Sequence, residues 1–375
     1  MRVAVVRETR EHERRVALVP ELVGRLTGVG LEIVVEPDAG RWAHHANQDY
    51  VDAGASIAEG ESLEGADVVL AVQPLDPARI ATLKPGAVVM SFLPTSAELD
   101  IVRAARDAQV TAFAMELVPR ISRAQSMDAL TSQALVAGYR SVLVAAERLP
   151  RFFPLSMTAA GTVPPARVLV LGAGVAGLQA IATAKRLGAK VDAYDVRSAS
   201  AEEIRSLGAR FVELDLPSLE GAGGYAREMT EERAQHQRDL LAPHVSSADV
   251  VITTAAVPGR SAPLLVERAA VEAMPPGSVV VDLAAESGGN VEGSQPGEEL
   301  TVGRSLLWGA RNVPSQLPVH ASRLYAANLV NLLLLMTTDG EVNVDLDDEI
   351  IAGVCVAHDG GIRHEPTREL LGEEG

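Results

Sequence analysis

Short apolar runs alternate with amphipathic stretches along the first third of the chain. The runs are β-branched and are bounded by glycine, proline or charge, which is typical of short buried strands. Between the first two runs, 20–30 has apolar residues at helical spacing and ends in glycines, which predicts a helix. Strands that alternate with helices indicate right-handed βαβ units around a parallel sheet. We predict strands at 2–6, 32–36, 67–72, 87–93 and 111–117.

A second series of the same kind follows a long helix, which we expect from about Ser126 to Glu147. Its predicted strands lie at 167–172, 190–195, 210–214, 249–255 and 278–284. A strongly apolar stretch at 320–336 predicts a buried helix that returns to the first half, and the acidic tail from 366 is expected to fray.

The predicted fold class is therefore α/β, with two Rossmann-like doubly wound domains that have parallel sheets and are linked by long helices. Residues 1–128 and 319–375 would form a discontinuous first domain, and residues 129–318 would form a dinucleotide-binding Rossmann domain.

Composition narrows the class further. The 375 residues are 47% hydrophobic, which excludes a disordered chain, and only 3% aromatic, so aliphatic residues build the cores. A net charge of −17 argues against nucleic acid and against adsorption to anionic lipid. The single Cys355 excludes an internal disulfide and thiolate metal cages, and we expect no metal.

No uncharged apolar stretch approaches the length of about 20 residues that a membrane span needs. The charged N-terminus does not resemble a signal peptide. We therefore expect a cytoplasmic chain without direct membrane insertion.

The sharpest motif follows the strand predicted at 167–172. Its first glycine suits a tight turn, its second lets the backbone approach a pyrophosphate, and its third lets the next helix pack closely on the strand. The N-terminus of that helix would bind the phosphates. The turn consists of Gly172, Ala173, Gly174, Val175, Ala176 and Gly177.

An acidic residue, Asp195, ends the next predicted strand, about 20 residues further on as this fingerprint requires. Its carboxylate would accept hydrogen bonds from the adenosine ribose and would repel a 2′-phosphate, which favours NAD(H). The neighbouring Val196 and Arg197 would also line the site, and Arg197 weakens the discrimination because an arginine can pair with that phosphate.

Three further segments allow a functional or a structural interpretation. Thr253 and Ala255 end a predicted strand, where small residues would let the nucleotide lie close, but they also fit an ordinary strand before a Pro-Gly turn. Asp282 and Glu286 could supply an acid or a base, although capping and turn roles are the stronger interpretation. The glycine-rich segment 217–231 lacks periodicity and is either a functional loop or disordered.

The chain resembles the NAD(H)-binding subunits of the proton-translocating nicotinamide nucleotide transhydrogenases, a family related to the alanine dehydrogenases. The resemblance covers nearly the whole length. Its segments are 8–21, 119–142, 171–197, 223–229 and 282–294, and RAQSMD with the downstream AGYR is the most specific part.

The resemblance implies direct hydride transfer between NADH on this chain and NADP⁺ on a partner. Arg120, Gln125 and Asp128 match the family's loop: Arg120 would contact the cofactor, while Gln125 and Asp128 would hold the nicotinamide ribose. Thr131 would touch the nicotinamide end, and Tyr225 matches the tyrosine of a loop that closes over the nucleotide. No protein acid or base is needed, because proximity and orientation of two rings suffice.

The resemblance also implies partners. These are transmembrane transhydrogenase subunits, including an NADP(H)-binding beta subunit, and a second copy of the chain in a homodimer. The chain would dock peripherally on the cytoplasmic face of the membrane.

Two other functions compete with this one. An alanine dehydrogenase-like enzyme would use Arg15, but the lysine and histidine expected of that family are missing: Ala71 stands at the lysine position and 91–99 contains no histidine. An NAD-sensing protein would keep the glycine turn and Asp195 without needing the 120–128 loop. Ala71 departs from some transhydrogenases as well.

Overall fold

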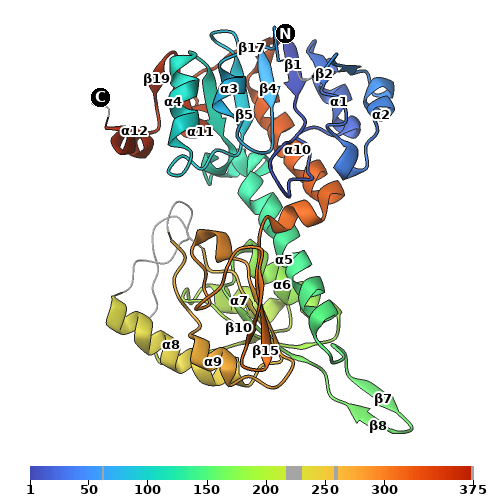
Figure 1. Cartoon of the computed structure of the whole chain (residues 1–375), viewed down its shortest axis with the longest axis vertical. Coiled ribbons are helices and arrows are strands. Elements are labelled where there is room, and N and C mark those ends of the chain that lie inside the picture. Colours follow the sequence, from blue (N-terminus) through green and yellow to red (C-terminus); the bar gives the residue numbers. More distant parts are fainter. Residues whose placement is uncertain (61–62, 217–229, 257–260, 373–375) are drawn as a thin grey trace. The chain divides into compact units, whose positions relative to one another are not determined.

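A computed structural model describes residues 1–60, 63–216, 230–256 and 261–372 (Figure 1). The chain forms two compact units, Met1–Gln133 with Pro314–Gly375, and Ala134–Val313. Both are built on sheets dominated by parallel strands with helices packed on them, so the predicted fold class is confirmed.

The first unit holds an eight-stranded sheet in the order β19-β18-β6-β5-β4-β1-β2-β3. Its six parallel strands follow the doubly wound order 3-2-1-4-5-6, with the switch point between β1 and β4. The strands are β1 (Arg2–Val5), β2 (Glu32–Val35), β3 (Ser56–Ile57), β4 (Val68–Leu70), β5 (Val88–Ser91), β6 (Thr111–Ala114), β18 (Cys355–His358) and β19 (Gly361–Ile362), with a separate pair β16 (Thr337–Thr338) and β17 (Glu341–Val342).

The strands of this sheet are buried on both faces, as parallel strands usually are. Val3 and Val5 belong to the core that includes α1 and α10, whereas Ala4 and Val6 belong to the core that includes α3 and α4. The helices are α1 (Pro20–Thr27), α2 (Asn47–Asp52), α3 (Pro77–Ile80), α4 (Leu99–Asp107), α10 (Pro318–Leu335), α11 (Glu349–Val354) and α12 (Glu365–Leu371), with 3₁₀ turns η1 (Arg41–Ala43), η2 (Met115–Leu117), η3 (Ser122–Met127) and η6 (Val313–Gln316).

The second unit repeats the same order in a seven-stranded sheet, β11-β10-β9-β12-β13-β15-β14, with its switch point between β9 and β12. Its strands are β7 (Ser156–Thr158), β8 (Gly161–Val163), β9 (Arg167–Leu171), β10 (Lys190–Tyr194), β11 (Arg210–Phe211), β12 (Val250–Thr253), β13 (Val279–Asp282), β14 (Glu299–Val302) and β15 (Ser305–Gly309). Its helices are α6 (Val175–Arg186), α7 (Ser200–Ser206), α8 (Glu231–Ser246), α9 (Arg268–Glu272) and the 3₁₀ turn η5 (Ala285–Ser287), and α5 (Ala129–Arg148) carries the chain from the first unit into the second.

Three features depart from the sequence expectations. β18, β19 and β14 pair antiparallel at sheet edges, so neither sheet is purely parallel. β7 and β8 form an exposed hairpin that was not predicted. The tail does not fray from 366, because α12 runs to Leu371 and Thr367 is buried.

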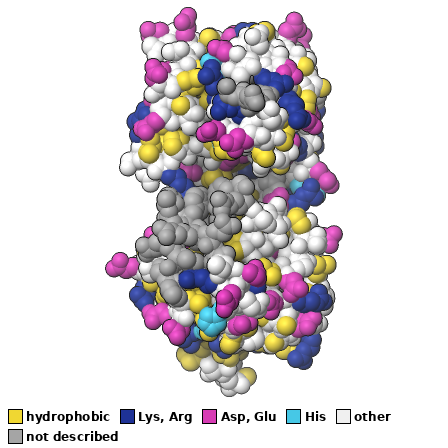
Figure 2. All heavy atoms as spheres, turned by 90° about the vertical axis from the view of Figure 1, so that its left-hand side faces the viewer, with side chains coloured by type: hydrophobic (Ala, Val, Ile, Leu, Met, Phe, Trp, Pro, Cys, Tyr) yellow, Lys and Arg dark blue, Asp and Glu magenta, His cyan; other side chains and the backbone are white. Residues whose placement is uncertain are grey.

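The surface is mixed in charge. On the face shown in Figure 2, Asp and Glu side chains are interspersed with Lys and Arg. None of the helices in the described part of the chain is long and apolar enough to span a bilayer.

Candidate functional site

The glycine-rich turn connects β9 to α6 at the switch point of the second sheet, where ligands bind in doubly wound folds. Gly172 has a φ of +102°, and a Cβ there would lie 2.6 Å from Thr254 Oγ1. A Cβ on Gly177 would lie 1.9 Å from the carbonyl oxygen of Gly172. A Cβ on Gly174 would meet no atom of the described residues within 4 Å, so the turn is open to a ligand at that position.

The N-terminus of α6 directs its first N–H groups out of this turn. Gly174 is the N-cap and Val175 is 38% exposed, so the unpaired donors and the helix dipole are accessible to an anion. Gly138 on α5 packs against the same turn, since a Cβ there would lie 2.1 Å from the carbonyl oxygen of Ala176. Sequence reasoning missed this contact, although a glycine inside a helical pattern often marks close packing.

Asp195 follows β10 and is 9% exposed. Its Oδ2 accepts a hydrogen bond from the Ala173 amide at 2.7 Å, and its Oδ1 accepts one from the Arg197 amide at 2.9 Å. The Arg197 guanidinium donates from Nε to Oδ1 at 2.9 Å and from Nη2 to Oδ2 at 3.0 Å. The hydrogen bond to Asp195 outweighs partial burial and raises the pKa of Arg197. Val196 lies between the two charged residues.

The end of β12 closes the other side of the switch point. Thr253 is fully buried and donates to Asp282 Oδ1 at 2.9 Å, so its side chain holds the neighbouring strand. Thr254 Oγ1 lies 3.1 Å from the carbonyl oxygen of Gly172 and packs on the glycine turn. Ala255 is held through both backbone groups by the buried Asn290 side chain, at 3.0 and 2.8 Å. No periodicity in the sequence indicates this role of Asn290.

Asp282 belongs to the same scaffold. Besides Thr253, its carboxylate accepts hydrogen bonds from the amides of Ala284, Asn290 and Val291 at 3.0, 3.0 and 3.3 Å. It is fully buried and surrounded by structural donors. This environment favours the structural interpretation of Asp282 over an acid or base role.

The loop with Arg120, Gln125 and Asp128 lies in the first unit, where η3 leads into α5. Arg120 and Gln125 are exposed. Asp128 occupies the N-cap position of α5: its carboxylate accepts from the Thr131 amide at 2.9 Å and from the Thr131 hydroxyl at 2.6 Å. Asp128 and Thr131 therefore form one hydrogen-bonded pair at the start of the helix.

Two asparagines of α10 anchor this loop. The side-chain amides of Asn328 and Asn331 both donate to the carbonyl oxygen of Ser126, at 2.9 and 3.0 Å. Arg123 adds a bidentate pair with Asp348, at 2.6 and 2.9 Å. The loop is thus fixed by residues more than 200 positions away in sequence.

The switch point of the first sheet is filled by charged side chains of the chain itself. Glu8 follows β1, and its carboxylate accepts from the amides of Val72 and Gln73, at 2.6 and 3.2 Å. Arg15 donates to both oxygens of Glu13, at 2.8 and 2.6 Å, and this pair is almost completely buried.

The environment of these groups separates their pKa values. Burial, with the charge of Glu13 adding to it, raises the pKa of Glu8 to about 8. Burial also acts to raise the pKa of Glu13, but the hydrogen bonds and charge of Arg15 outweigh it and lower the pKa to about 2. The first unit thus holds a protonated carboxyl beside an ionised one at neutral pH.

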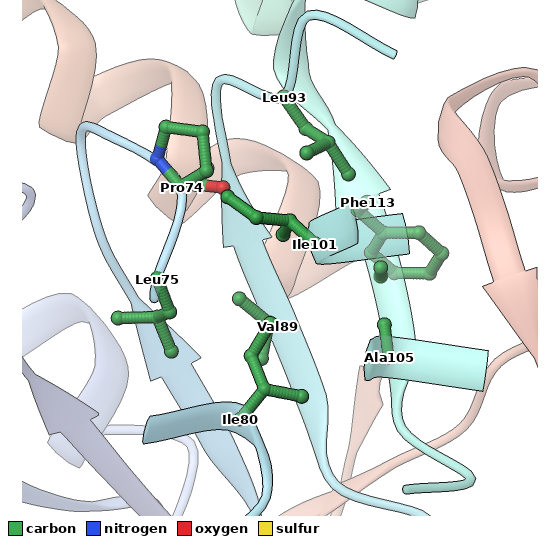
Figure 3. A pocket seen from close by; sticks show the side chains of 10 residues that line it. Pro74, Leu75, Ile80, Val89, Leu93, Ile101, Ala105 and Phe113 are labelled. Atoms are coloured by element: carbon green, nitrogen blue, oxygen red, sulfur yellow. The ribbon is translucent and has the colours of Figure 1, made fainter. Parts of the chain in front are cut away.

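A small hollow in the first unit is apolar. Figure 3 shows Leu75, Ile80, Val89 and Ile101 around it, below α3 and α4. Among the lining side chains, none is charged, so the hollow is a gap in packing and not a reactive site.

The predicted site residues fall into two groups. Gly172–Gly177, Asp195–Arg197, Thr253 and Ala255 converge in the second unit, whereas Arg120, Gln125, Asp128 and Thr131 lie along one segment that begins in the first. Tyr225 and the rest of 217–229 lie outside the described residues.

These features define a two-unit α/β protein whose second unit carries a dinucleotide-type turn with an acidic residue after the next strand. Profiles of the alanine dehydrogenase/PNT family match it throughout: the N-terminal domain profile matches residues 4–137 and the C-terminal domain profile matches residues 141–365. The chain belongs to the alanine dehydrogenase/PNT family.

Individual relatives divide into two groups. An NAD(P) transhydrogenase alpha subunit of Rhodospirillum rubrum is 46% identical, over 97% of this chain and 98% of that protein. The crystal structure of a transhydrogenase from Sinorhizobium meliloti has a TM-score of 0.89 and 42% identity, over 96% of this chain and all of that one. An alanine dehydrogenase of Mycobacterium tuberculosis is 29% identical, over 99% and 97%.

Proposed function

We propose that this chain is the NAD(H)-binding subunit of a transhydrogenase, an oxidoreductase in which hydride passes directly between NADH on this chain and NADP⁺ on a partner subunit. The observation that carries the proposal is the 46% identity to a transhydrogenase alpha subunit along nearly the whole of both chains. The open turn at Gly174 beside Asp195 supports nucleotide binding in the second unit.

In this proposal the second unit holds the ADP half of NAD(H). The pyrophosphate binds the N–H groups at the start of α6, and Asp195 accepts hydrogen bonds from the adenosine ribose. Ala255 and the backbone of Thr253 line the other side of the switch point, held there by Asn290 and Asp282.

Arg120, Gln125, Asp128 and Thr131 bind the nicotinamide end in the same proposal, and Tyr225 closes over the nucleotide. The polar groups that Asp128 and Thr131 share are of the kind that grips a ribose. They supply orientation, which is what a carbon-to-carbon hydride transfer needs, because no proton has to be moved.

The proposed complex includes separate transmembrane subunits that couple the reaction to proton translocation, among them an NADP(H)-binding beta subunit. The chain would dock on them at the cytoplasmic face. It would also pair with a second copy, and the β7–β8 hairpin is suited to that contact, because Leu155 and Met157 expose 53% and 78% of their surface there.

An alanine dehydrogenase activity is the second candidate, favoured by the 29% identical relative. Two observations weigh against it. The guanidinium of Arg15, which would bind the substrate carboxylate, already pairs with the carboxylate of Glu13. Ala71, at the position expected to hold a lysine, is buried and has no charge to offer.

The decisive experiment measures NADH oxidation by the chain in two mixtures. One contains pyruvate and ammonium, and the other contains an NADP⁺-loaded beta subunit. Turnover only with the beta subunit supports the proposal. Turnover of pyruvate by the chain alone would overturn it, and NADH binding without turnover in either mixture would favour a sensor.

A further inference from the structure

The most specific contact in the nucleotide site is made by the protein with itself. Arg197 grips Asp195 through Nε and Nη2, at 2.9 and 3.0 Å, in a bidentate fork. The same side chain lies 3.4 Å from the carbonyl oxygen of Ala173, beside the glycine turn. Asp195 has a 7% exposed side chain and Arg197 a 27% exposed one, so the fork is partly shielded from water.

A guanidinium fork fits a phosphate as well as it fits a carboxylate. A 2′-phosphate on the adenosine ribose would arrive beside Asp195, where the proposed function places the ribose hydroxyls. It would find a negative charge there, and it would find the nearest guanidinium already engaged by that charge.

We infer that Arg197 is a specificity-determining residue, a latent 2′-phosphate binder that Asp195 keeps occupied, so that the pair and not Asp195 alone selects NAD(H) over NADP(H). This inference rests on the proposed nucleotide site in the second unit. It explains how an arginine can lie at this position without conferring NADP(H) binding.

Removal of the Asp195 charge should release Arg197 to a new partner. Asp195→Asn keeps the size of the side chain and an oxygen that accepts from the Ala173 amide. Asp195→Ser is a second, smaller variant with an acceptor. Arg197→Ala and the double variant Asp195→Asn/Arg197→Ala complete a cycle that isolates the contribution of the guanidinium.

Strand β10 offers a matched control. Asp192 is gripped by Arg210 through Nε and Nη2, at 2.9 and 2.6 Å, in the same bidentate geometry. Asp192→Asn therefore removes an equal charge from the same strand and releases an equal guanidinium, away from the glycine turn.

The test is equilibrium binding of NADH and of NADPH to the full chain, followed by nicotinamide fluorescence. The unaltered chain should prefer NADH. Asp195→Asn should raise the NADPH-to-NADH affinity ratio by at least about tenfold, as expected for a charge-assisted pair. Adding Arg197→Ala should abolish the gain, and Asp192→Asn should show none.

Two results would overturn the inference. If the double variant keeps the gain of Asp195→Asn, only repulsion was removed and Arg197 has no part. If Asp195→Asn and Asp195→Ser fold but gain nothing for NADPH, the guanidinium does not reach the phosphate. Failure of the unaltered chain to bind NADH would overturn the proposed function itself, which is a different outcome from either.

Discussion

The two units share one strand order but end it in opposite chemistry. In the second, the switch point holds a glycine turn whose Gly174 faces open space. In the first, the carboxylate of Glu8 occupies the amides of Val72 and Gln73, and the Glu13–Arg15 pair is buried behind it. An intramolecular carboxylate thus lies where a ligand anion lies in folds of this kind. The difference shows that side chains at the strand ends, and not the sheet, decide whether the crevice can take a ligand.

The comparison can be broken most strongly at the buried pair. Glu13→Gln leaves the Arg15 charge without its partner, and we expect a loss of about 3–5 kcal/mol in the stability of the first unit. Hydrogen exchange resolved along the chain would measure it there. Glu213→Gln, which breaks the exposed pair with Arg205, should cost less than about 1 kcal/mol. Equal effects would show that the first crevice is not closed by its ion pair.

The glycine turn offers the next largest effect. Gly177→Ala places a methyl 1.9 Å from the Gly172 oxygen, and we expect a loss of about 1–3 kcal/mol in stability together with lost NADH binding. Gly174→Ala meets open space at a negative φ, so it should leave the melting temperature unchanged or slightly higher while NADH binding weakens. If Gly174→Ala binds NADH normally, the backbone there does not approach the ligand.

The pH dependence should differ between the units because of Glu8. Its native pKa of about 8 exceeds the ordinary 4.5, so its contribution is complete below pH 4.5 and is lost as the pH rises through 8. The stability of the first unit should fall over that range with a slope of at most about 1.4 kcal/mol per pH unit.

Glu8→Gln stays neutral and should flatten this fall in a urea titration series between about pH 5 and 9. Glu13 does not interfere, because a pKa lowered to about 2 gives stability that is lost only as the pH falls below 4.5. A slope that survives in Glu8→Gln would assign it to another group.

The smallest effect on stability is expected at the start of α5. Asn is as good an N-cap as Asp, so Asp128→Asn should change the unfolding free energy by less than about 0.5 kcal/mol. Hydride transfer to the NADP⁺-loaded beta subunit should nevertheless drop if the carboxylate grips the ribose. Thr131→Val tests the other half of the pair. A parallel loss of stability and transfer in Asp128→Asn would indicate a purely structural cap.

Much of the architecture was predictable from local pattern. The buried parallel strands appear as short β-branched runs, and the long helix was expected from Ser126, close to its start at Ala129. β14 and β15 were missed because Glu299–Val302 alternates weakly and sits at an edge. The β7–β8 hairpin was missed because its residues are mostly exposed and carry no core pattern.

The sequence by itself determined the two doubly wound units, the glycine turn and the acid that follows it, because these depend on hydrophobic period and on residue spacing along one stretch of chain. Only the tertiary structure decided which charges are engaged. Arg15 with Glu13, Glu8 with the amides after β4, and Asn328 with Ser126 join distant segments or depend on burial. Hydrogen bonds between side chains leave no periodic trace in sequence, so their partners emerge only when the sheets assemble.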